Sequence, residues 1–158
     1  MPTKKTRRRR RLRSKVVVQR AAGTAPAAAL LRKYALAASL AGSRVTLRVV
    51  GAAEGRLLNG RFRGRNYATN VLAFSYAPRH GDVVLCHPVI RKEAKEQRKS
   101  LAAHYAHLVV HGMLHLRGHD HRRKNDAARM ERMEVRILRR LGFDDPYSEH
   151  ASEHAAVK

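Results

Sequence analysis

The sequence predicts an α+β domain in which a small four-stranded mixed sheet packs against about five helices. Two patterns lead to this fold class. Short segments that alternate in polarity or are rich in β-branched residues, as strands are, occupy the N-terminal half, whereas apolar positions recur with helical spacing after residue 88. Apolar residues make up 44% of the 158 residues, which is enough for one domain with a buried core.

Four segments have the composition of strands. They are residues 16–19 (VVVQ), 44–50 (RVTLRVV), 71–76 (VLAFSY) and 82–86 (DVVLC). The sequence PRHG separates the last two and has the composition of a turn, so we expect these two strands to form a hairpin.

Five segments have the pattern of helices. They are residues 26–39, 52–59, 89–97, a helix that begins after Ser100, and 125–141. Pro26 suits a first helical turn, Asn59-Gly60 suits a helix exit, and Ser100 suits an N-cap. The expected buried stripes are Leu30, Leu31, Tyr34 and Ala38 in the first helix, and Met130, Met133, Ile137 and Leu141 in the last.

The charge of the chain is strongly unbalanced. Its 34 Lys and Arg residues against 12 Asp and Glu give a formal net charge of +22. Such a charge opposes compaction by self-repulsion, and a polyanionic partner is the usual reason for it. Nucleic acid is the first candidate, because phosphate neutralisation releases counterions, and an anionic membrane surface is the second.

Nine of the first fifteen residues, MPTKKTRRRRRLRSK, are Lys or Arg. We expect a disordered basic tail over residues 1–14 that binds phosphates, a folded domain over 15–148 and a flexible C-terminal tail over 149–158. The Arg- and Ala-rich start also resembles a transit peptide, but Arg32 and Lys33 interrupt its apolar run. We therefore expect no targeting segment.

The compartment follows from the cysteine content. Cys86 is the single cysteine, which excludes an internal disulfide framework and fits a reducing compartment, so we expect a cytoplasmic protein. No apolar run approaches the length of a transmembrane helix, and we expect no membrane association. The oligomeric state is left open.

The stretch HGMLHLRGHDH, residues 111–121, has the spacing of a metal site. His111 and His115 are four residues apart and so share one helix face. Gly118 suits a turn that brings His121 back to the same ion. Three imidazoles with a fourth position open suit one catalytic Zn²⁺ ion.

The same pattern differs from that of zinc proteases at one position. Those enzymes carry a general-base Glu directly after the first histidine, and this chain has Gly112 there. Peptide hydrolysis by that route is therefore disfavoured. His107 is either a residue that orients a metal ligand or a packed histidine, and Asp120 either orients a ligand or caps the turn. His104 and His119 receive no role.

HGMLHLRGHDH resembles the metal motif of the YbeY family of bacterial rRNA maturation factors. The upstream block LLNGRFRGRNYATNVLAFSY, the segment GDVVLC and the downstream LGFDDPY are similar to that family as well, so the resemblance spans about residues 44–147. The chain departs from the family at His119, where Tyr is typical, and in its Arg-rich tail.

The resemblance implies a zinc-dependent, single-strand-specific endoribonuclease. It would act on precursor rRNA in 16S rRNA 3′-end maturation and in ribosome quality control, with the small ribosomal subunit as partner. It implies that His111, His115 and His121 are the catalytic metal ligands. The family pattern LN-x-x-(Y/F)-R matches residues 58–63 and implies that Arg63 is catalytic.

Several alternatives stay open at the level of the sequence. Water or the substrate's 2′-hydroxyl is the nucleophile, and no residue stands out as the general acid. A non-catalytic ribosome-assembly factor with a structural zinc is one other function, and a fourth protein ligand to the metal would favour it. A metallohydrolase of another substrate is the second, and an acidic side chain near the metal would favour that.

Overall fold

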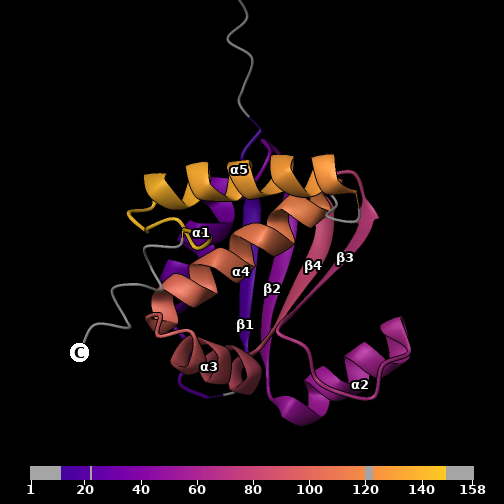
Figure 1. The fold of residues 1–158 in the computed structure, drawn as a ribbon. Helices are drawn as coiled ribbons and strands as arrows, with labels where there is room; N and C mark the ends of the chain where they lie inside the picture. Colours follow the sequence, from indigo (N-terminus) through magenta and orange to yellow (C-terminus); the bar gives the residue numbers. More distant parts are fainter. Residues whose placement is uncertain (1–11, 22, 120–122, 149–158) are drawn as a thin grey trace, which may run out of the picture.

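The computed structural model describes residues 12–21, 23–119 and 123–148, which form four strands and five helices (Figure 1). In chain order they are β1 (Lys15–Arg20), α1 (Ala28–Ala38), β2 (Arg44–Val50), α2 (Ala52–Arg63), β3 (Val71–Ala77), β4 (His80–Cys86), α3 (His87–Glu96), α4 (Leu101–Leu116) and α5 (Lys124–Arg140).

The strands form one mixed sheet in the order β1-β2-β4-β3. β1 pairs parallel with β2 and β2 pairs parallel with β4, whereas β3 lies antiparallel beside β4. The antiparallel pair is joined by a tight turn in which Arg79 adopts a positive φ of 64°. The predicted four-stranded mixed sheet, its five helices and its hairpin are confirmed.

The two faces of the sheet are covered differently. Leu47, Val83 and Leu85 point into the main core, where α1 and α4 pack on the strands and α5 packs on α4. Leu72 and Val84 belong to a smaller cluster that Leu58 of α2 covers. Helix α4 therefore lies between the sheet and α5, and its position is fixed from both sides (Figure 1).

The ends of α4 follow the sequence prediction. Ser100 is its N-cap, and its Oγ accepts a hydrogen bond from the Ala103 amide at 3.0 Å. Gly118 adopts a φ of +91° just after the helix, where a Cβ would be strained, and the His119 amide donates to the Leu114 carbonyl at 3.1 Å. The last turn of α4, which carries His115, is thus followed by a position whose backbone conformation favours glycine.

Two local predictions were wrong. Asn59-Gly60 does not end α2, which continues to Arg63 and ends at Gly64 with a φ of 66°. The reason is tertiary: the Asn59 side chain is buried and donates from Nδ2 to the Tyr67 carbonyl at 2.6 Å, so it holds the following loop instead of leaving the helix. Leu30 is 42% exposed and does not belong to the buried stripe of α1.

The predicted tails lie mostly outside the described residues, so the domain boundaries at 14/15 and 148/149 stay predictions. Among the helices that the structure describes, none has the length and apolar character needed to cross a membrane.

Candidate active site

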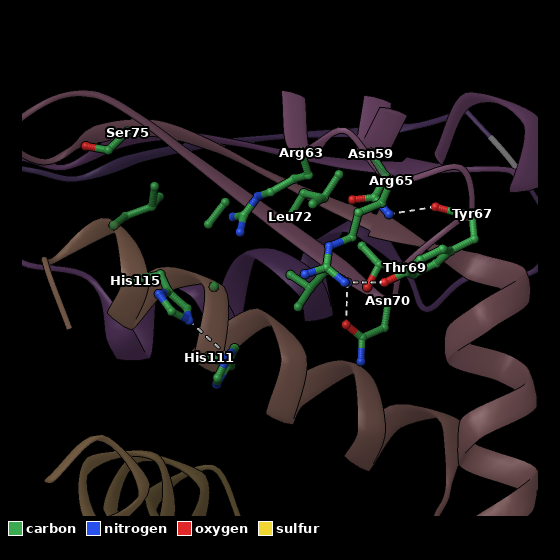
Figure 2. A pocket seen from close by; sticks show the side chains of 14 residues that line it. Asn59, Arg63, Arg65, Tyr67, Thr69, Asn70, Leu72, Ser75, His111 and His115 are labelled. Atoms are coloured by element: carbon green, nitrogen blue, oxygen red, sulfur yellow. Dashed lines mark hydrogen bonds between the residues drawn. The ribbon is translucent and has the colours of Figure 1, made fainter. Parts of the chain in front are cut away.

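Helix α4 brings His111 and His115 together at the edge of a cavity of about 440 Å³ (Figure 2). Their Nε2 atoms are 3.1 Å apart. Two imidazole lone pairs at this distance repel each other unless a proton or a cation lies between them. A hydrogen bond between the two rings satisfies this spacing, and so would a cation bound by both.

Glu134 of α5 holds His111 from behind. Its Oε1 lies 2.5 Å from His111 Nδ1, and the side chain is fully buried. Burial alone would raise the pKa of Glu134, but hydrogen bonds from His107, His111 and Tyr147 together lower it to about 2. The ionised carboxylate accepts a hydrogen bond from Nδ1–H of His111, which leaves the Nε2 lone pair directed toward the cavity.

Tyr147 and His107 complete the environment of Glu134. The Tyr147 hydroxyl donates to Glu134 Oε2, and His107 Nε2 lies 3.0 Å from the same oxygen. Burial, followed by the Glu134 carboxylate, raises the pKa of the Tyr147 hydroxyl. His107 thus contacts the carboxylate behind His111 and does not line the cavity itself.

The opposite wall of the cavity is basic. Arg63, the last residue of α2, and Arg65 in the following loop both line it. Figure 2 shows the Arg63 guanidinium directed into the space between α2 and the histidines. Arg65 donates to the Tyr67 hydroxyl at 2.9 Å, and Tyr67, which lines the cavity, is 51% exposed. The structure therefore brings Arg63, His111 and His115 to one cavity.

The third predicted ligand, His121, lies outside the described residues, and so does Asp120. Within residues 12–21, 23–119 and 123–148 no group of three His, Cys, Asp or Glu side chains is placed to hold a metal ion. The predicted zinc site on the C-terminal helix and the turn after it thus stays a prediction, with two of its three ligands converging.

Gly112 has a structural reason that the sequence did not supply. A Cβ at this position would lie 2.7 Å from Cγ1 of Val83 in the sheet, so a side chain fits there only if α4 or Val83 shifts. The face of α4 next to His111 packs directly on β4, and a Glu at this position would clash with the sheet. Furthermore, no described residue that lines the cavity is acidic.

The other histidines of α4 and its turn lie elsewhere. His104 is buried and pairs with Glu93 of α3 through Nε2 at 2.7 Å. His119 follows Gly118, and burial, with Arg117 and Arg129 nearby, lowers its pKa. Neither residue lines the cavity.

Sequence reasoning missed Glu134 and Tyr147, and also Arg65 and Tyr67. A signal for Glu134 existed: it lies on the buried stripe of α5, four residues after Met130 and three before Ile137, where a carboxylate is out of place unless it is paired. Its partner could not be named, because that depends on how α5 packs on α4.

A mixed sheet whose covering helix presents paired histidines toward two arginines is the arrangement of an enzyme for anionic substrates. A family profile described as endoribonuclease YbeY matches residues 12–142. The chain is 50% identical over 141 residues to the endoribonuclease YbeY of Aromatoleum aromaticum, and this match covers 84% of this chain and 92% of the relative. It is 53% identical over 116 residues to the endoribonuclease YbeY of Paraburkholderia phymatum, and this match covers 70% of this chain and 76% of the relative.

The chain belongs to the endoribonuclease YbeY family. The predictions of the family and of an endoribonuclease, a hydrolase of RNA phosphodiester bonds, are confirmed at the level of the family. The family is one of metal-dependent nucleases. The solution structure of TM1509 from Thermotoga maritima has the same fold, with a TM-score of 0.57 and 20% identity over 85% of this chain and all of that chain.

Proposed function

We propose that this chain is a zinc-dependent, single-strand-specific endoribonuclease that acts in the cytoplasm on precursor rRNA of the small ribosomal subunit. Its proposed tasks are 16S rRNA 3′-end maturation and ribosome quality control. The observation that carries the proposal is the cavity itself: two converging histidines face Arg63 and Arg65, and no described lining residue is acidic. Such a cavity attracts a phosphodiester and offers no described carboxylate for peptide hydrolysis.

The residues fit a metal ion. His111 and His115 present Nε2 atoms 3.1 Å apart, and a buried carboxylate fixes the Nδ1 proton of His111, which is the outer partner that metal-binding histidines commonly have. We propose His111, His115 and His121 as the ligands of one Zn²⁺ ion. When bound, the ion supplies Lewis-acid chemistry to water or to the phosphoryl oxygens.

Arg63 has the position of a phosphate clamp. Its guanidinium faces the histidines across the cavity (Figure 2). A planar guanidinium donates two parallel hydrogen bonds to phosphoryl oxygens and stabilises the negative charge that grows on them during cleavage. The helix that carries it is held by the buried Asn59, so the clamp starts from a fixed backbone.

Tyr67 supports a preference for single strands. Its exposed ring stands beside the cavity and is oriented by the Arg65 hydrogen bond to its hydroxyl. An aromatic face binds an unstacked base of any identity, whereas the bases of a duplex are already stacked on one another. A strand held at Arg63 by a phosphate thus has a place for a neighbouring base.

The test is metal analysis together with cleavage of a single-stranded RNA by the wild type and the His115→Ala variant. We expect about one zinc ion per wild-type chain, and loss of both zinc and cleavage in the variant. His80→Ala, which removes an exposed histidine of β4, is the matched control and should keep both. Full cleavage by the His115→Ala chain would contradict the proposal; zinc retention without any wild-type cleavage would favour the non-catalytic assembly factor.

A further inference from the structure

Helix α5 carries a row of arginines that the proposed active site does not use. Its inner side, with Met130, Glu134 and Ile137, is buried against α4. The opposite side carries the exposed side chains of Arg129, Arg132, Arg136, Arg139 and Arg140, which we call the α5 stripe. Steps of three and four residues place all five on one side of the helix, along about 16 Å of its axis.

The stripe has no counter-charge of its own. In the part of the chain that the structure describes, none of its five arginines forms a hydrogen bond or an ion pair. Like charges at helical spacing, such as Arg132 with Arg136 and Arg136 with Arg140, destabilise a helix. Glu131 and Asp126 are the exposed or half-buried acidic residues of α5, and both lie on the flanks of the stripe.

The stripe also borders a hollow. Arg132, Arg136, Arg139 and Arg140 line an open surface depression of about 720 Å³, together with Tyr147 and the acidic Glu131 and Asp145. Four guanidinium groups around one depression form a row of bidentate donors that matches phosphate oxygens in geometry as well as in charge. Two acidic side chains at the same depression leave an excess of positive charge.

The stripe is close to the proposed active site. Glu134, on the inner side of α5, touches His111, so the stripe and that histidine lie on opposite sides of a single helix. Figure 1 shows α5 lying next to the C-terminal half of α4. A helix with its side chains is about 10 Å wide, which a strand of a few nucleotides crosses readily.

We infer that the α5 stripe is a second RNA-binding surface, which holds the phosphate backbone of the substrate outside the cavity where cleavage is proposed. This inference rests on the proposed function for the identity of the polyanion. Because phosphate contacts position a strand without reading its bases, the stripe would add affinity for long RNA and leave the cleavage chemistry unchanged.

The experiment compares two triple variants of the full chain. Arg132→Gln, Arg136→Gln and Arg139→Gln remove three charges from the stripe, and Arg91→Gln, Lys92→Gln and Lys95→Gln remove three exposed charges from α3 as a matched control. Binding is measured over a salt series with a 30-nucleotide single-stranded RNA and with a dinucleotide, which is too short to reach from the cavity across α5. Each chain carries His115→Ala so that the RNA stays intact.

For the long RNA we expect the stripe variant to reduce the slope of log K against log salt by about 2, since each single-strand phosphate contact contributes about 0.7. The α3 control should change it little, and the dinucleotide should bind all chains alike. Equal slopes for the two triple variants would overturn the inference. Binding to phosphatidylglycerol vesicles is measured as well, and a stripe variant that loses vesicle binding but keeps RNA binding would also overturn it. Cleavage by the chain without His115→Ala is measured separately, so failure of the proposed function is seen independently.

Discussion

Helix α4 carries two histidines that each pair with a glutamate of a neighbouring helix. The two pairs differ in which ring nitrogen faces the carboxylate. His104 faces Glu93 through Nε2 at 2.7 Å, whereas His111 faces Glu134 through Nδ1 at 2.5 Å. Nδ1 of His104 is buried and has no hydrogen-bond partner among the described residues, while Nε2 of His111 reaches the cavity next to His115. The remaining nitrogen of His104 is thus enclosed by the fold, whereas that of His111 lies at the cavity, where we propose it as a metal ligand.

The two carboxylates also differ, in their burial and in their hydrogen bonds. Glu134 is 1% exposed in its side chain and accepts from three donors, whereas Glu93 is 26% exposed and also accepts from Asn70. A fully buried, ionised carboxylate is stable only with its hydrogen bonds complete, so Glu134 keeps His111 in one orientation. Glu93 can exchange part of its bonding with water, and its histidine stays inside the protein.

The strongest test of this comparison substitutes each histidine in turn and measures both RNA cleavage and stability. His111→Ala should lower RNA cleavage by more than about 100-fold, beyond the 10- to 100-fold effect typical of outer partners of a metal ligand. His104→Gln, which retains a donor toward Glu93, should keep cleavage within a few-fold and lower the unfolding midpoint instead. If both variants lost cleavage equally at equal folded fraction, the distinction between the two pairs would be wrong.

Glu134 and Glu93 give the second comparison. Glu134→Gln keeps the shape of the side chain but replaces an acceptor oxygen by an amide, so His111 loses its fixed proton position. We expect metal affinity and cleavage to fall 10- to 100-fold, measured by zinc titration and initial rates. Glu93→Gln is the matched variant and should change both by less than about threefold. Unfolding curves for the two variants check that the folded fraction is comparable.

Much of the fold followed from local patterns, because alternation and apolar spacing are local properties. The range 44–50 matches β2, and Ser100 caps α4 as its sequence indicates. The end of α2 was mispredicted, since Asn59 serves a tertiary hydrogen bond to Tyr67 that no local pattern contains.

The site divides in the same way. Helical phase alone placed His111 beside His115, and the family resemblance singled out Arg63, which lines the same cavity. Glu134 was missed, because its contact joins two residues on different helices that are 23 positions apart in the sequence. Whether His121 completes the ligand set stays a prediction, because it lies outside the described residues.

Gly112 tests how closely α4 packs on the sheet near His111, because it lies beside His111 and far from His104 on α4. In Gly112→Ala the new Cβ would lie 2.7 Å from Val83, so α4 must shift away from β4, and we expect a loss of about 1–3 kcal/mol in the free energy of unfolding. Gly60→Ala in α2 is the control: its Cβ makes an ordinary 3.4 Å contact, and we expect about 0.5–1 kcal/mol of stabilisation. Denaturant unfolding measures both, and a neutral Gly112→Ala variant would show that the contact with Val83 yields.

The smallest effect concerns the protonation of His104. Burial lowers the pKa of His104 below its ordinary value of 6.5, and this outweighs the opposing effect of the hydrogen bond to Glu93. The unfolded chain binds a proton near pH 6.5 and the folded chain does so only at lower pH. This contribution to stability is therefore complete above pH 6.5 and is lost as the pH falls through the folded pKa.

His104→Gln removes that contribution. Between pH 7.5 and 5, the free energy of unfolding should fall less steeply in the variant than in the wild type, measured by denaturant unfolding at each pH. His87, whose pKa burial also lowers, is present in both chains, so the difference between them isolates His104. Parallel pH dependences would mean that His104 titrates alike in both states, and that the His104–Glu93 pair owes its place in the fold to packing alone.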